Sequence, residues 1–114
     1  MPSIKEPLAL AVLLAAALPG AALAQAAWPA AKPITLIVPY SAGGSVDYNA
    51  RLVATKLGER LKQSVVIENV TGAGGAIGVA KAVNAAPHGY TLVAGPGSAI
   101  AIGKLINPAA FKFD

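Results

Sequence analysis

The sequence predicts an α/β domain built on a parallel sheet, in the order β-α-β-α-β. Three short apolar runs rich in β-branched residues, at 34–38, 64–69 and 90–94, are typical of strands buried on both faces of a sheet. Stretches with helical spacing of apolar residues separate these runs, and a glycine-rich turn follows each of them. Because such alternation joins parallel strands through right-handed crossovers, the three turns are expected to gather at one edge of the sheet.

The first helix is expected to run from Asp47 to about Leu61, after Pro39 has ended the first strand. Asp47 is expected to be its N-cap, because the carboxylate can accept hydrogen bonds from the free N–H groups of the first turn. Apolar residues at three- and four-residue spacing form the face expected to pack on the sheet: Ala50, Val53, Leu57 and Leu61.

A shorter second helix is expected between the second and third strands. Ile77, Ala80 and Val83 recur at three-residue spacing, and the helix should end before a Pro-His-Gly turn. The third strand is followed by a turn at 95–98 and by a weakly apolar segment at 99–106. No closing strand or helix follows, so the sequence resembles a domain that has been cut off.

The first 24 residues are predicted to be an export signal rather than part of the fold. Lys5 gives a weakly positive start, an uninterrupted apolar run covers 8–18, and a small-x-small pattern ends at Ala24. Cleavage is therefore expected between Ala24 and Gln25. The run is shorter than the about 20 residues that a transmembrane helix needs, which disfavours the alternative of an uncleaved anchor. The mature protein is expected to be periplasmic and not inserted into the membrane.

Charge and cysteine content exclude several classes of function. The formal net charge is +4, but the basic residues are scattered singly, without the clusters and interleaved aromatics of nucleic-acid-binding proteins. A mild positive balance fits an anionic ligand, and it equally fits an ordinary solvated surface. The chain has no cysteine, so it folds without disulfides. We expect no nucleic-acid partner.

Two glycine-rich segments are the main candidate for a functional site: the first elbow, residues 39–47, and the second elbow, residues 71–75. Each lies between a predicted strand and a predicted helix, at the edge of a parallel α/β sheet where ligands bind. A helix that starts there has several N–H groups without intrahelical acceptors, at the positive end of its dipole. Glycine also lets a ligand approach the backbone closely. The elbows therefore predict a site for a small anion, and a carboxylate in particular.

Nucleotide-binding motifs do not fit these glycines. A dinucleotide fingerprint G-x-G-x-x-G counted from Gly72 has its last position at Ile77, and Gly78 comes one residue late. A P-loop ends in G-K-[ST], whereas Gly103 and Lys104 are followed by leucine. We therefore expect no nucleotide and no other cofactor.

Catalytic and metal sites have little support in the sequence. Ser41, Ser45 and Ser98 lie in the turns, but none has a base beside it. His88 is the only histidine and lies in a tight Pro-Gly turn, where a surface role is expected. Because no residues have metal-ligand spacing either, we expect a binding protein without catalytic residues and without a metal.

Single elbow residues have a structural interpretation beside the functional one. Asp47 can only cap the helix, or it can also orient the elbow or accept a hydrogen bond from a ligand ammonium or hydroxyl. Tyr40 can face a ligand at the end of the strand, or it can pack against its neighbours. For the glycines of both elbows, tight turning alone is the alternative.

Several stretches match a known family in order and spacing. They are Lys-Pro-Ile and Ile-Val-Pro-Tyr within 32–40, Gly-Gly-Ser-Val-Asp at 43–47, Val-Ile-Glu-Asn at 66–69, Gly-Ala-Gly-Gly-Ala-Ile-Gly at 72–78 and Ala-Pro-His-Gly-Tyr-Thr-Leu at 86–92. With them the chain resembles the tripartite tricarboxylate transporter substrate-binding proteins, also called the Bug or TctC family. Ser41 and Ala42 depart from the prolines that are common there, and His88 takes the place of an aspartate.

The resemblance implies a two-lobed Venus-flytrap fold of the periplasmic-binding-protein type, with 25–114 as the N-terminal part of lobe 1. It implies an extracytoplasmic receptor that captures a di- or tricarboxylate or a related acid and delivers it to a membrane permease. Carboxylate oxygens of the ligand would meet backbone N–H groups and hydroxyls of the turns. The matching residues are Tyr40, Ser41, Gly43, Gly44, Ser45, Asp47, Ala73, Gly74, Gly75 and Ser98.

Two other classes of function compete with this interpretation. The first is a truncated exported domain that has lost binding and has a structural or interaction role. The second is an exported hydrolase, which is remote because no nucleophile and base form a pair in the sequence.

Overall fold

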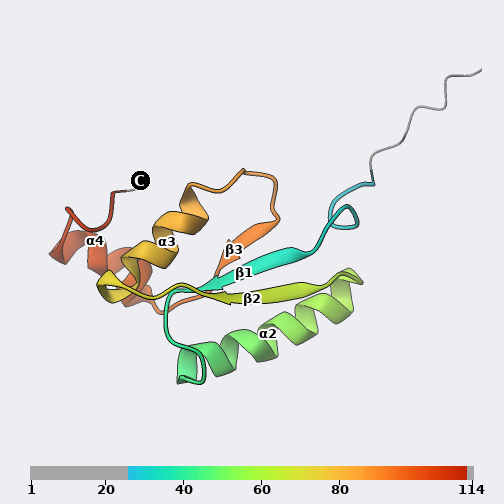
Figure 1. The fold of residues 1–114 in the computed structure, drawn as a ribbon, viewed down its shortest axis with the longest axis horizontal. Helices are drawn as coiled ribbons and strands as arrows, with labels where there is room; N and C mark the ends of the chain where they lie inside the picture. Colours follow the sequence, from blue (N-terminus) through green and yellow to red (C-terminus); the bar gives the residue numbers. More distant parts are fainter. Residues whose placement is uncertain (1–25, 113–114) are drawn as a thin grey trace, which may run out of the picture.

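A parallel sheet in the order β2-β1-β3 forms the centre of the computed structural model, which describes residues 26–112 (Figure 1). The strands are β1 (Ile34–Val38), β2 (Val65–Asn69) and β3 (Thr91–Val93). β1 pairs with β2 from its first residue to its last, so that Val38 lies opposite Asn69, and it pairs with β3 from Thr35 opposite Thr91. The predicted order β-α-β-α-β and the parallel pairing are confirmed.

Helices lie on both faces of this sheet (Figure 1). α2 (Ser45–Leu61) packs on β1 and β2, and α3 (Ala76–Val83) packs on β1 and β3 from the opposite side. A short 3₁₀ turn, η1 (Ala73–Gly75), leads into α3. After β3 the chain forms a π-type turn, η2 (Ser98–Ile102), which runs into α4 (Gly103–Ile106). Each strand is therefore followed at its carboxyl end by a turn that starts a helical segment.

The face that α2 presents to the sheet matches the predicted one at Ala50 but not at Val53. Ala50 and Ala54 are buried in the core beside Leu36 and Val38, whereas Val53 is 58% exposed. The prediction that Val53 packs on the sheet is therefore wrong. The small alanines lie against β1 and β2, and the Val53 side of the helix borders an open apolar groove that reaches the end of β3.

α2 also begins earlier than predicted. Gly44 is its N-cap and Ser45 its first residue, so Asp47 lies within the first turn. The prediction that Asp47 is the N-cap is wrong, and no side chain caps this helix. The other end is marked by Lys62, which has a left-handed φ of 51° and donates its backbone N–H to the Gly58 carbonyl.

Segments near both ends of the described chain contact the turn before β3 and the start of α4. Trp28 Nε1 donates to the Gly89 carbonyl at 3.2 Å. Phe111 is buried, and a Cβ built on Gly103 would lie only 2.3 Å from its Cζ. The weakly apolar segment predicted after the third strand thus forms η2 and α4, with Ala99 fully buried.

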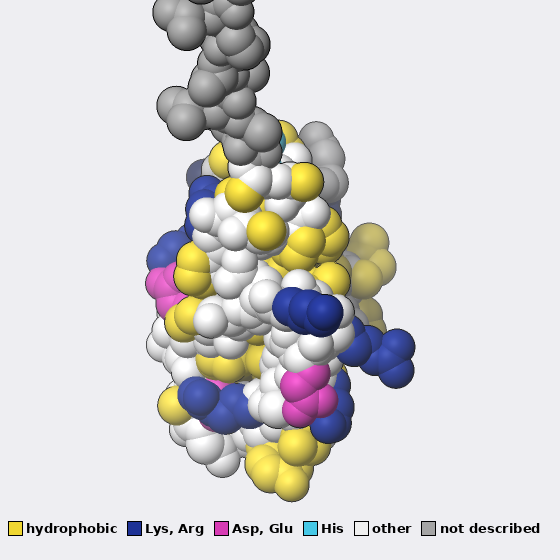
Figure 2. Space-filling model, turned by 90° about the vertical axis from the view of Figure 1, so that its right-hand side faces the viewer, with side chains coloured by type: hydrophobic (Ala, Val, Ile, Leu, Met, Phe, Trp, Pro, Cys, Tyr) yellow, Lys and Arg dark blue, Asp and Glu magenta, His cyan; other side chains and the backbone are white. Residues whose placement is uncertain are grey.

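Charged side chains are spread over the surface. Figure 2 views the molecule from the right-hand side of Figure 1 and shows dark-blue Lys and Arg side chains at several places on that face, some of them beside magenta Asp and Glu side chains. Lys56 pairs with Glu59 at 2.9 Å, and Lys81 pairs with Glu68. Between residues 26 and 112 no helix is long and apolar enough to cross a membrane. The predicted export signal lies outside the described residues.

Replacing Gly78 by alanine is expected to lower the free energy of unfolding by about 1–3 kcal/mol. A Cβ at this position would lie 2.7 Å from the Val70 carbonyl oxygen and 2.8 Å from the Cβ of the buried Pro39, and neither atom can move aside easily. Urea unfolding measures the change. Gly97→Ala is the matched control, because a Cβ there meets no atom within 4 Å. Equal stability of the two variants would contradict this close packing.

Candidate functional site

The first elbow joins β1 to α2, and four of its predicted site residues are exposed: Ser41, Gly43, Gly44 and Ser45. Gly43 has a φ of +84° with open space at its Cβ position, so glycine is needed here for the backbone conformation. The first N–H groups of α2 have no intrahelical acceptors, and no side chain caps them. These donors lie at the positive end of the helix dipole and are suited to bind an anion.

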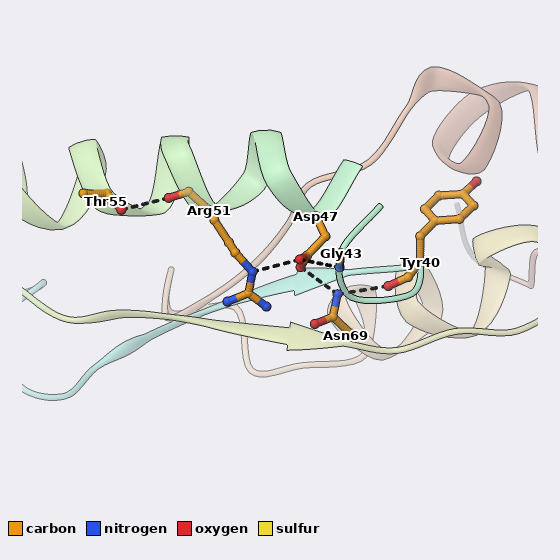
Figure 3. Close-up of polar contacts among 6 residues, drawn as sticks. All are labelled: Tyr40, Gly43, Asp47, Arg51, Thr55 and Asn69. Atoms are coloured by element: carbon orange, nitrogen blue, oxygen red, sulfur yellow. Dashed lines mark hydrogen bonds and ion pairs between the residues drawn. The ribbon is translucent and has the colours of Figure 1, made fainter. Parts of the chain in front are cut away.

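Asp47 lies beneath this elbow with only 2% of its surface exposed. Its Oδ2 accepts a hydrogen bond from the Gly43 backbone N–H at 2.9 Å and another from Arg51 Nε at 2.8 Å (Figure 3). Its Oδ1 accepts from the Asn69 side-chain amide at 2.9 Å. The same amide nitrogen donates to the Tyr40 carbonyl at 3.0 Å. Both carboxylate oxygens of Asp47 are thus bonded within the protein.

These hydrogen bonds lower the pKa of Asp47 far below its usual value. The bond from Arg51 contributes most, the Gly43 N–H and the Asn69 amide follow, and burial acts in the opposite direction. The same interaction raises the pKa of Arg51. Asp47 is therefore ionised at neutral pH, and Arg51 balances its charge. A contact between Asp47 and a ligand stays a prediction, while the observed contacts of its carboxylate are with the elbow and β2.

The second elbow is a left-handed turn. Gly72, Ala73, Gly74 and Gly75 all have positive φ, at 127°, 47°, 64° and 100°. The Gly75 N–H closes the turn on the Gly72 carbonyl at 3.0 Å. Ala73 is the one residue of this run with a side chain, and the left-handed region disfavours it by about 1–2 kcal/mol. Ala73 and Gly74 are exposed, as expected for residues that could meet a ligand, whereas Gly75 is buried.

Tyr40 connects the two elbows. Its hydroxyl donates to the Gly74 carbonyl at 3.2 Å, and its own carbonyl is held by Asn69. In Figure 3 its ring points away from the Asp47 carboxylate, so the two ends of this residue act on different parts of the site. Of the two interpretations of Tyr40, packing against the neighbouring turn is observed, and a ligand contact stays a prediction.

The third turn, 95–98, lies beside the elbows as the parallel order predicts. A Cβ built on Gly75 would lie 2.9 Å from the Cβ of Ala99, which follows this turn, and 3.3 Å from the Tyr40 hydroxyl. The buried Pro39 lies between the segments, 2.8 Å from the Cβ position of Gly78 and 3.1 Å from that of Gly95. The prediction that the three turns gather at one edge is confirmed.

The other predicted or considered residues lie as follows. Ser98 is exposed at the start of η2, and His88 is exposed in its turn. Within residues 26–112 no group of three or more His, Cys, Asp or Glu side chains could hold a metal ion. Asn69 and Arg51 were not predicted as site residues. The position of Asn69 at the end of β2, level with the end of β1, is the signal that could have found it.

A parallel α/β sheet whose uncapped helix start and glycine turns meet at the carboxyl edge has its candidate ligand site at that edge. A family model described as the tripartite tricarboxylate transporter family receptor, TctC, matches residues 49–108. The chain belongs to this family.

Curated relatives agree with this assignment. A UPF0065 protein of Agrobacterium vitis is 47% identical over 85 residues, which cover 74% of this chain and 24% of that protein. Protein BugT of Bordetella pertussis is 48% identical over 63 residues, which cover 55% of this chain and 19% of BugT. The chain thus spans about a quarter or less of the length of these relatives.

Three solved structures are similar to this chain in both fold and sequence. A structure of a periplasmic transporter has a TM-score of 0.71 and 43% identity, covering 77% of this chain and 29% of that one. An R. palustris protein with adipate has a TM-score of 0.60 and 38% identity, covering 63% and 24%. MatC from Rhodopseudomonas palustris with bound malate has a TM-score of 0.55 and 38% identity, covering 58% and 22%.

Proposed function

We propose that this chain forms one wall of a cleft in which an extracytoplasmic receptor captures a small carboxylate. The observation that carries the proposal is the uncapped start of α2, where Gly43, Gly44 and Ser45 are exposed, together with an exposed second elbow that Tyr40 joins to the first. Membership of the tricarboxylate receptor family supports it. Similar proteins solved with adipate and with malate support a carboxylate in particular.

The binding mode follows from the donors available at this edge. Carboxylate oxygens of the ligand accept hydrogen bonds from the first N–H groups of α2 and from the hydroxyls of Ser41 and Ser45, and the second elbow and Ser98 complete the wall. Charge-assisted bonds of this kind are about twice as strong as those between neutral groups. Because Asp47 turns its carboxylate into the protein and is balanced by Arg51, it does not repel the ligand.

The remaining parts of the proposed receptor are assigned from the sequence pattern and from the family. Residues 1–24 are the export signal, and 25–114 are the N-terminal part of lobe 1. Another lobe closes the cleft from the opposite side, and a membrane permease receives the ligand from the periplasmic receptor. The turns bind and release the ligand unchanged, as the receptor role implies.

The test uses the polypeptide translated from the complete native reading frame. Malate and adipate are titrated calorimetrically, and thermal unfolding is followed with each. A carboxylate at about 100 times its Kd should stabilise the protein by about 2.7 kcal/mol. Adipamide, the uncharged diamide of adipate, is the ligand control and should have no effect. No stabilisation by malate, adipate or citrate at millimolar concentration would contradict the proposal and favour a non-binding exported domain.

A serine pair locates the site within the chain. Ser45→Ala removes an exposed hydroxyl at the start of α2 and should weaken malate or adipate binding by about threefold to tenfold, the effect of one lost hydrogen bond. Ser64→Ala is the matched control, because Ser64 is exposed just before β2, at the opposite end of the sheet. Equal affinities of these two variants would place the ligand elsewhere.

A further inference from the structure

We propose that Asn69 and Asp47 form a clasp that holds the first elbow in its binding conformation without touching the ligand. The clasp consists of these two side chains together with the Tyr40 carbonyl and the Gly43 N–H that they bind. The inference rests on the proposed carboxylate site. It assigns Asp47 a positioning role and adds Asn69 as a second positioning residue.

Register explains why Asn69 can act on the elbow. Asn69 is the last residue of β2 and lies opposite Val38, the last residue of β1, so its side chain reaches the loop that follows β1. An amide nitrogen has two hydrogens, and both are used here: one on the Tyr40 carbonyl at 3.0 Å and one on Asp47 Oδ1 at 2.9 Å. The beginning of the elbow and the carboxylate beneath it are thus bound to one side chain.

Asp47 fixes the other end of the elbow. Its Oδ2 binds the Gly43 N–H at 2.9 Å, while Arg51 holds the same oxygen from the next turn of α2 (Figure 3). One peptide group at each end of the loop 40–43 is therefore turned into the protein. The intervening Ser41 and the following Ser45 remain exposed. The orientation of the ligand-facing donors is set before any ligand arrives, which lowers the entropy cost of binding.

The clasp also holds the Asp47 carboxylate on the buried side of the helix start. Asp47 lies in the first turn of α2, where a free carboxylate would accept hydrogen bonds from the uncapped N–H groups. The bonds to Asn69 and Arg51 hold the carboxylate on the buried side instead. The residues from Gly44 to Val46 stay available to an external anion because the Asp47 carboxylate is bound to Gly43, Asn69 and Arg51.

The experiment compares Asn69→Ala with Val79→Ala in the polypeptide from the complete native reading frame. Asn69→Ala removes the two hydrogen bonds that the Asn69 amide donates. Val79→Ala destabilises the buried face of α3 and leaves the clasp intact. The Kd of malate and of adipate is measured by calorimetry at a temperature at which circular dichroism shows both variants folded. Asn69→Ala should raise the Kd about tenfold or more, and Val79→Ala should change it less than about twofold.

Amide hydrogen exchange of Gly43, measured without ligand, gives an independent readout. The Gly43 N–H should exchange faster in Asn69→Ala than in the wild type and be unchanged in Val79→Ala. If Asn69→Ala does not fold, Asp47→Asn takes its place. This change keeps the shape of the Asp47 side chain but replaces one carboxylate oxygen by an NH₂ group, which cannot accept the hydrogen bonds from Gly43, Arg51 or Asn69. A clasp variant that binds as the wild type does would overturn the clasp alone. A wild type that binds no carboxylate would instead overturn the proposed function.

Discussion

Replacing Asn69 by aspartate is expected to lower the Tm at pH 7 by more than about 10 °C. The new carboxylate would lie where an amide now donates to Asp47 Oδ1 at 2.9 Å and to the Tyr40 carbonyl at 3.0 Å. The new carboxylate, the Asp47 carboxylate and the Tyr40 carbonyl are all acceptors, and no hydrogen would lie between them. Asp47 is only 2% exposed, so water cannot replace the lost donors. Asn49→Asp makes the same chemical change at an exposed position of α2 and should shift the Tm by less than about 3 °C.

The pH dependence of the Tm of Asn69→Asp shows whether the variant is destabilised by repulsion between two carboxylates or by a loss of packing. Two adjacent carboxylates raise the folded-state pKa of one of them above the unfolded value of about 3.9, so the destabilisation shrinks as the pH falls through that raised pKa. In the wild type the pKa of Asp47 is lowered, so its contribution is present above about pH 4 and is lost on acidification below it. The two Tm curves should therefore converge between pH 7 and pH 3. A constant gap would rule out carboxylate repulsion as the cause.

Gly75→Ala is expected to lower the free energy of unfolding by about 2–4 kcal/mol. Gly75 has a φ of +100°, and a Cβ there would lie 2.9 Å from the Cβ of Ala99 and 3.3 Å from the Tyr40 hydroxyl. The loss of stability therefore has two sources, the strained backbone conformation and the collision with Ala99 and Tyr40. Chemical denaturation followed by tryptophan fluorescence and circular dichroism measures the change.

Gly74→Ala is the matched comparison, because Gly74 also has a positive φ, +64°, but nothing lies within 4 Å of its Cβ position. It should cost about 1–2 kcal/mol, the conformational term alone. Ala73, at φ 47° in the same turn, shows that alanine can adopt this conformation here. The difference between the two variants measures the contact between the second elbow and the segment after the third turn. No difference would mean that these segments do not touch.

The fold could be predicted because its signals are local. The run 34–38 is β-branched and ends at a proline, and β1 has those bounds. The second strand begins within one residue of the predicted position, and α3 contains the three residues whose spacing predicted the second helix. Parallel order then followed from the alternation of strands and helices, and it placed the three turns at one edge without any knowledge of side-chain contacts.

The two predictions that were wrong, for Val53 and for Asp47, concern positions that are set by contacts between segments far apart in the sequence. Helical spacing permits both the Val53 face and the Ala54 face, and the close approach of α2 to β1 and β2 selects the smaller residue. Asp47 has the residue type of an N-cap, but Asn69, far along the chain, binds its carboxylate under the elbow and leaves Gly44 as the cap. Spacing along the chain does not contain that pairing, which needs the register of β1 and β2.

Pro39 gives the three turns a common mechanical behaviour. Buried Pro39 lies against the Cβ positions of Gly75 in the second elbow, Gly78 in the first turns of α3 and Gly95 in the third turn. Close-packed atoms transmit displacements. A shift of one turn is therefore expected to displace Pro39 and, through it, the other two turns. The three turns are therefore expected to move together and not as separate loops.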